Sequence, residues 1–161
     1  MAAVAASTGG HWAADARVAR RLRAAAVLYA AAWAVHTGDH LRRGLGVVTL
    51  EVSVVGSLAA VVQLLCIGAV LTGQPWAAVA AVAIGFPDAI GITAVHLLPH
   101  WSSFSDAFPG ARGTGVTAFS WFAAGAEIAG ALAFGLAGAS AWRRATTQPR
   151  AGLDVGGRAG R

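Results

Sequence analysis

Four long apolar stretches, separated by short polar or glycine-rich links, dominate the chain. They cover about residues 22–41, 47–72, 76–99 and 116–142. A helix needs about 20 mostly apolar residues to cross ~30 Å of hydrocarbon, so each stretch is long enough to be a transmembrane helix. The first is the weakest, because its strictly apolar part is short and resembles the hydrophobic core of a signal peptide. We predict that it is retained, because the His36–His40 pattern that ends it is too specific for a discarded leader.

The short links predict the arrangement of these helices, since they make sequential helices antiparallel neighbours. The predicted fold is an all-α integral membrane protein, with a four-transmembrane-helix antiparallel bundle over residues 17–144. Residues 1–16 and 145–161 are small, polar or rich in Gly and Arg, which predicts a mobile N-terminal tail and a disordered C-terminal tail. In the fourth stretch, Ala131, Gly135 and Ala139 form a ladder of small residues. Such a ladder allows close packing within the bundle, in a homodimer or in a larger membrane complex, and the sequence does not choose among the three.

The placement of arginine predicts the orientation. Nine of the twelve basic residues, all of them Arg, lie beside or beyond the outermost helices: Arg17, Arg20, Arg21, Arg23, Arg143, Arg144, Arg150, Arg158 and Arg161. Because cytoplasmic segments carry the excess of positive charge, both termini are predicted to be cytoplasmic. Abundant Ala, Gly and Arg with neither Lys nor Asn indicates a GC-rich bacterial genome, and hence a bacterial inner (plasma) membrane.

The composition argues against a soluble domain and against a nucleic-acid-binding protein. Hydrophobic residues make up 57% of the chain and charged residues 12%, against about 25% charged residues in a soluble domain. The arginines flank apolar stretches without interleaved aromatic residues, so no nucleic-acid surface is predicted. Cys66 is the single cysteine, which excludes an internal disulfide and a thiolate-rich metal site.

The candidate chemistry lies near the extracytoplasmic ends of the helices. At a rise of 1.5 Å per residue, His36, Glu51 and His96 come to nearly the same level just below the outer surface. His40 and His100 follow His36 and His96 by four residues, and on a helix such residues project from the same face. The predicted metal set is His36, His40, Glu51, His96 and His100, with Asp39 as a ligand or a carboxylate that orients one, and with Asp106 nearby in the outer loop.

A second polar layer is predicted deeper in the bilayer. Asp88 and Glu127 each lie about eleven residues from the outer end of their helix, near the midplane. Ionisable groups at this depth are costly and usually face the bundle interior. If the two carboxylates face each other, close like charges raise the pKa of one. We therefore predict a pair that relays protons.

Histidine and carboxylate without thiols suit zinc, copper or iron. His36 and His96, from different helices, could instead be axial ligands of a b-type haem. The leading hypothesis is a metal or haem site for redox chemistry or metal handling, and whether the protein is an enzyme stays open.

Three alternatives dispense with a resident metal: an intramembrane acid–base enzyme acting on a lipophilic substrate, a proton-coupled carrier of a small molecule, and a non-catalytic subunit of a larger complex. Soluble catalytic motifs such as GxSxG, HExxH and the phosphate-binding loop are absent from the sequence.

Overall fold

The computed structural model describes residues 11–111 and 114–147, and all regular structure in these ranges is helical. The all-α class predicted from the sequence is therefore confirmed. The elements are α1 (His11–Ala14), α2 (Ala16–Arg43), a 3₁₀ turn (Leu45–Val47), α3 (Leu50–Leu71), α4 (Ala77–Ile92), a π-helical turn that continues it (Thr93–Leu97), and α5 (Ala118–Thr147).

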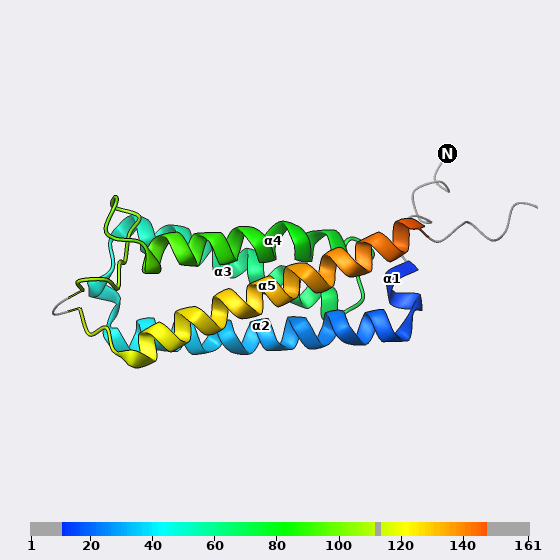
Figure 1. The fold of residues 1–161 in the computed structure, drawn as a ribbon, viewed down its shortest axis with the longest axis horizontal. Coiled ribbons are helices and arrows are strands. Elements are labelled where there is room, and N and C mark those ends of the chain that lie inside the picture. The colour runs from blue at the N-terminus through cyan, green and yellow to red at the C-terminus, as the bar shows by residue number, and fades with distance from the viewer. Residues whose placement is uncertain (1–10, 112–113, 148–161) are drawn as a thin grey trace, which may run out of the picture.

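Among the described residues, three helical segments are long and apolar enough to cross a membrane. They are Leu50–Leu71, Ala77–Leu97 and Ala118–Thr147. The 28-residue α2 lies alongside them and carries arginines near both of its ends. Successive long helices run in opposite directions, so that the start of α2 and the end of α5 lie at one end of the molecule (Figure 1). The loops that follow α2 and α4 lie at the other end.

The helix α5 packs between α2 and α4, and glycine makes the α4–α5 contact close. A Cβ atom added at Gly85 would lie 2.5 Å from the carbonyl oxygen of Ala131 and 2.6 Å from the amide nitrogen of Gly135. At Gly138 it would meet the Cβ of Ala81 at 2.7 Å. Small residues allow this backbone approach, and in a bilayer such packing holds helices together. Ala131 and Gly135, from the predicted ladder, are therefore buried within a single chain.

One face of α2 is buried along its whole length. Leu22, Tyr29, His36 and Arg43 recur every seventh residue, and all four are buried. Seven residues complete nearly two turns of an α-helix, so these side chains project toward the same side of the bundle. The buried face is apolar at Leu22 and polar at His36 and Arg43, near the loop end. Its polar part contributes α2 side chains to the site described below.

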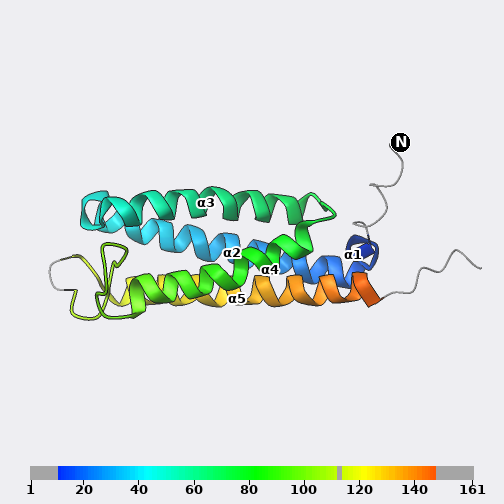
Figure 2. The same ribbon diagram turned by 90° about the horizontal axis from the view of Figure 1, so that it is seen from above.

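The helix α3 lies on the outer side of α2 and α4 (Figure 2). Many of its side chains are exposed, including Leu58 and Leu65 at more than 60%. Exposed leucine and valine over so many turns match a surface that faces lipid rather than water. The packing between α3 and the rest of the bundle leaves room for the cavity described below.

Several helix ends differ from the sequence expectation. The third stretch was predicted to be helical to residue 99, but the helix ends at Leu97 and Leu98 is extended. Pro99 explains this end, because proline disfavours the helical conformation in the residue before it. At the other end, Trp12 was predicted to lie in a mobile tail, yet it belongs to α1, is only 2% exposed and donates its indole N–H to the Gln74 carbonyl at 3.2 Å. Residues 145–147, also predicted to lie in a disordered tail, are the last residues of α5. The parts of the predicted tails at 1–10 and 148–161 lie outside the described residues.

Candidate metal centre

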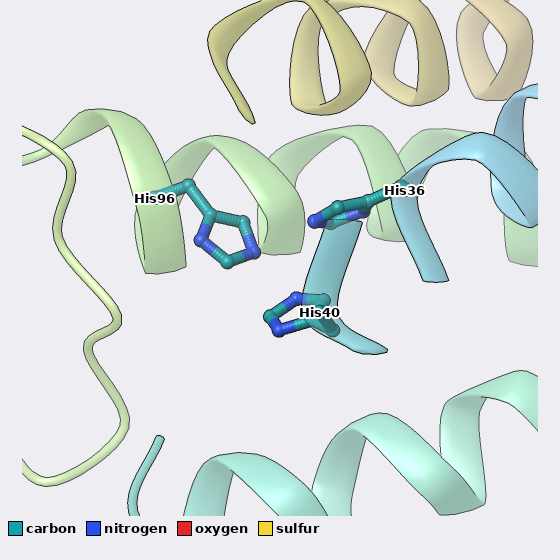
Figure 3. A group of neighbouring side chains, drawn as sticks. All are labelled: His36, His40 and His96. Carbon is teal, nitrogen blue, oxygen red and sulfur yellow. The ribbon is translucent and has the colours of Figure 1, made fainter. Parts of the chain in front are cut away.

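Three imidazoles from two helices meet near the loop end of the bundle. His36 and His40 come from α2 and His96 from the π-helical turn after α4. One ligand nitrogen from each lies within 4.8 Å of the others, and the three rings surround a common space (Figure 3). The His36 and His96 ring centroids are 4.8 Å apart, and His40 lies 4.8 Å from His36 and 5.4 Å from His96.

His36 has one paired and one unpaired nitrogen. Its Nδ1 pairs with Oε2 of Glu127, and both side chains are almost completely buried. In the neutral tautomer whose Nδ1 donates to this carboxylate, Nε2 of His36 keeps its lone pair. That Nε2 atom is buried and has no hydrogen-bond partner among the described residues. A buried unpaired acceptor is costly and calls for an explanation, such as a bound ion.

His96 is oriented in the same way by a different acceptor. Its Nδ1 donates to the backbone carbonyl of Asp106 at 3.1 Å, and a carbonyl only accepts, so Nε2 of His96 also keeps its lone pair. A hydrogen bond from the second ring nitrogen to a carboxylate or carbonyl is the usual support of a metal-binding histidine. The π-helical backbone at Thr93–Leu97 is itself of a kind found frequently at functional sites.

A buried ion pair holds the loop that supplies this carbonyl. Nη1 and Nη2 of Arg43 each lie 2.7 Å from a different carboxylate oxygen of Asp106, in a bidentate pair. Burial alone would raise the pKa of Asp106, but the hydrogen bonds and charge of Arg43 outweigh it and hold that pKa below its ordinary value. The Phe108 ring lies against the His96 ring, tilted by 34° with centroids 4.6 Å apart, and the Arg43 guanidinium lies over the Phe108 ring at 5.3 Å from its centroid. Arg43 thus fixes His96 through the loop rather than by direct contact.

A cavity of about 290 Å³ adjoins the three histidines. All three histidines line it, together with apolar side chains of α3 and α4 such as Val52, Val55 and Ile92. Gln63, Asp88 and Glu127 also line the cavity, so it joins the histidines to the deeper polar groups. A molecule in this cavity would be surrounded mainly by apolar groups and would meet a few polar atoms in defined places.

The other predicted ligands lie elsewhere. Glu51, in the first turn of α3, is exposed and is not part of the histidine group. His100 is also exposed, because the helix ends before it and it no longer shares a face with His96. The Oδ1 atom of buried Asp39 accepts hydrogen bonds from Arg42 at 2.8 and 3.0 Å and from Ser120 at 3.1 Å. This carboxylate therefore ties α2 to α5.

The two deep carboxylates line one cavity but have separate partners. Glu127 pairs with His36, as described. Asp88 accepts a hydrogen bond from the Tyr29 hydroxyl at 2.7 Å and another from the side-chain amide of Gln63. The predicted relay is thus two polar clusters side by side, one of which includes a candidate metal ligand.

The site also includes three residues that the sequence did not predict: Arg43, Tyr29 and Phe108. For the first two a signal existed: Tyr29 precedes His36 by seven residues and Arg43 follows it by seven, so all three share a helix face. Phe108 and the Asp106 carbonyl belong to an irregular loop, for which no period exists. Their positions depend on the folded chain.

Comparison of the chain with protein families, with curated protein sequences and with solved structures gives no match. We therefore infer the function from the site itself.

Proposed function

We propose that this chain is a membrane protein that binds one transition-metal ion through Nε2 of His36, Nε2 of His96 and a ring nitrogen of His40. The observation that carries the proposal is the buried, unpartnered Nε2 of His36, which lies beside two further imidazoles while its Nδ1 pairs with Glu127. Nitrogen donors without thiolates suit zinc, copper and iron. The Glu127 carboxylate would raise the basicity of His36 and hold its ring in place.

The geometry favours a single ion over a b-type haem. Two axial histidines must leave the whole plane between them free for the porphyrin. Here the His40 ring lies beside both His36 and His96, with centroids 4.8 and 5.4 Å away. Three imidazoles around one point match instead the ligand set of a catalytic zinc site, in which three protein ligands leave a fourth position open.

The cavity supports a catalytic or metal-handling role. An ion held by the three imidazoles would face the 290 Å³ space, where a small molecule could reach its open position. A bound ion of this kind lowers the pKa of coordinated water and polarises substrate oxygens. Glu127 and Asp88 line the same space and would accept or donate protons there. We propose redox or metal-handling chemistry at this site.

The setting that we propose is the inner membrane of a bacterium, with α2 as a fourth span and both termini in the cytoplasm. The arginines near the start of α2 and the end of α5 support this orientation, because they gather at one end of the bundle. The histidines would then lie near the extracytoplasmic face.

The metal proposal is tested with purified protein. We expect elemental analysis to find one transition-metal ion per chain, and we expect Co²⁺ added to metal-stripped protein to develop the absorption of a nitrogen-ligated ion. His36→Ala and His96→Ala should each weaken binding by more than the roughly 10–100-fold that loss of a supporting residue costs. His100→Ala is the matched control, because His100 is exposed and outside the group. Failure of the unaltered protein to bind Co²⁺, Zn²⁺ or Cu²⁺, or equal losses in His36→Ala and His100→Ala, would overturn the proposal.

A second candidate is acid–base catalysis on a lipophilic substrate without a metal. The mostly apolar wall of the cavity favours it, since α3 residues such as Val55 line the cavity and are also exposed on the lipid-facing helix. In this case Glu127 and His36 would form the acid–base pair. Activity retained after complete metal removal would select this candidate, and activity restored only by added metal would exclude it.

A further inference from the structure

A second cavity, of about 240 Å³, lies between α2 and α5 at the end of the bundle opposite the histidines. Three arginines line it: Arg17 and Arg21 from α2, and Arg144 from α5. Val18, Leu136, Ala137 and Ser140 complete the lining. Nothing in the proposed metal chemistry uses this cavity.

Helical periodicity explains why the charges converge. Arg17 and Arg21 are one turn apart on α2, and Ser140 and Arg144 are one turn apart on α5, so each pair projects from one face of its helix. The face of α2 and the face of α5 meet at the cavity. Three guanidinium groups around one space create a local positive potential that attracts an anion.

The charges around this cavity are poorly compensated. Within the described part of the chain, the side chains of Arg17 and Arg21 have no hydrogen-bond or ion-pair partner. Arg144 has one ion pair, in which its Nη1 lies 3.7 Å from Oδ2 of Asp15 with both side chains more than one-third exposed. An exposed pair at this distance contributes little. Among the described residues, Arg17 and Arg21 thus offer guanidinium groups with no acceptor, and Arg144 offers one held only by this exposed pair.

The chemistry of the lining selects phosphate. The planar donor fork of Arg matches the oxygens of a phosphate in bidentate geometry. The Ser140 hydroxyl adds a donor at the same place. One turn deeper, Leu136 lines the cavity and is 60% exposed, and Leu132 continues the same face a turn further on. A phosphate ester with apolar chains would thus find charge at one end and exposed leucine along its length.

We propose that this cavity binds the phosphate group of an anionic phospholipid, with the acyl chains lying along Leu136 and Leu132. Basic pockets between transmembrane helices on the cytoplasmic side are a recognised binding mode for such headgroups. The depth agrees, because the arginines lie at the ends of their helices and the leucines lie toward the apolar middle of α5. Lipid held here bridges α2 and α5 at the end where the α2 arginines would otherwise repel Arg144.

The test compares two triple variants with the same change in charge. Arg17→Gln, Arg21→Gln and Arg144→Gln together remove the cavity arginines. Arg20→Gln, Arg23→Gln and Arg143→Gln remove three arginines from the same helix ends that do not line the cavity. Native mass spectrometry of the detergent-purified protein, titrated with phosphatidylglycerol and separately with phosphatidylcholine, measures the lipid bound. Helix content, measured by circular dichroism, monitors folding of all three proteins.

For the unaltered protein we expect preferential retention of phosphatidylglycerol over phosphatidylcholine. The cavity triple should lower phosphatidylglycerol affinity at least about tenfold, since each lost charged hydrogen bond is worth a substantial part of that factor. The control triple should lower it several times less. Equal losses in the two triples would mean that general surface charge is responsible and would overturn the proposal.

A further arm distinguishes the two sources of a phosphate group. Inorganic phosphate in millimolar excess should not displace phosphatidylglycerol, because it cannot use the leucine surface. If inorganic phosphate displaces the lipid completely, the cavity is a site for a free anion and the lipid assignment is wrong. Both results are independent of whether the metal proposal holds.

Discussion

The contact between Glu127 and His36 determines what Glu127 contributes to the site. It lies in the middle of α5 and is 2% exposed, and its only hydrogen-bond partner among the described residues is Nδ1 of His36. When the carboxylate accepts a hydrogen bond from Nδ1 of a neutral His36, the lone pair of the ring is on Nε2, on the side of His40 and His96. In the proposed metal site, the same carboxylate would hold the ring in one orientation and raise the basicity of its ligating nitrogen.

Replacing Glu127 with Gln tests this role. Gln can still accept the hydrogen bond but carries no charge, so we expect metal affinity to fall about 10–100-fold while the helix content is unchanged. Titration of the metal-stripped protein with Co²⁺ measures the affinity. Asp88→Asn is the matched control, because Asp88 lines the same cavity but bonds to Tyr29 and Gln63 rather than to a histidine. Equal effects of the two substitutions would contradict a specific role for Glu127.

At the scale of the helices, α4 and α5 pack closely against each other. This contact fixes the positions of His96, which follows α4, and of Glu127, which is in α5. Gly85 and Gly138 are both needed for this contact, as the short distances from an added Cβ show. The loop after α4 forms a second element with a defined role. Its Asp106 bonds to Arg43 through the side chain and to His96 through the carbonyl, so α2 holds the π-helical turn in place. Removing one partner of a buried ion pair leaves an uncompensated charge, which makes Arg43 a structural part of the site.

Gly85→Ala should separate α4 from α5. The new methyl group would lie 2.5 Å from the backbone oxygen of Ala131, so α5 would have to move away from α4. Overpacking of this kind lowers the free energy of unfolding by about 1–3 kcal/mol. Unfolding in mixed detergent micelles, followed by circular dichroism, measures the change. Gly91→Ala in the same helix is the control, since an added Cβ there meets nothing within 4 Å. That control should be neutral or slightly stabilising, because Ala favours a helix over Gly by about 1 kcal/mol. A Gly85→Ala protein as stable as the Gly91→Ala protein would contradict the close contact.

At the scale of the whole molecule, the two ends of the bundle differ in chemistry. Histidines, carboxylates and a structured loop occupy one end, and exposed arginines occupy the other. The proposed topology places the histidine end outside the cytoplasm and the arginine end within it. The metal and the phospholipid would then bind on opposite sides of one membrane.

Cysteine labelling tests this orientation. In a protein whose single Cys66 is replaced by Ala, Ser103→Cys marks the loop at the histidine end and Gln74→Cys marks the turn between α3 and α4. Both positions are exposed. We expect a membrane-impermeant maleimide to label Ser103→Cys in intact bacteria and to label Gln74→Cys only after lysis. The reverse pattern would invert the topology, and labelling of both in intact cells would contradict the span between them.

Much of the fold could be predicted from the sequence, because length and apolar pattern determine whether a segment is a long apolar helix. The structure confirms helices in all four predicted stretches, and three of them meet the length and composition of a membrane span. Depth along each helix followed as well, since the rise per residue is constant. It placed His36 and His96 at one level, where their rings lie 4.8 Å apart.

Only the tertiary structure determines which residues contact one another across different helices. Sequence determines the height of a residue and the face that it shares with its neighbours on the same helix, but not which other helix that face meets. Glu51 was expected beside His36 and His96 but lies on an exposed face, whereas Glu127 was expected to face Asp88 and pairs with His36. The rotation and crossing of packed helices are set by contacts such as Gly85 against Ala131, which link residues far apart in the chain. Those contacts bring His36, His40 and His96 together, and they leave His100 outside the group.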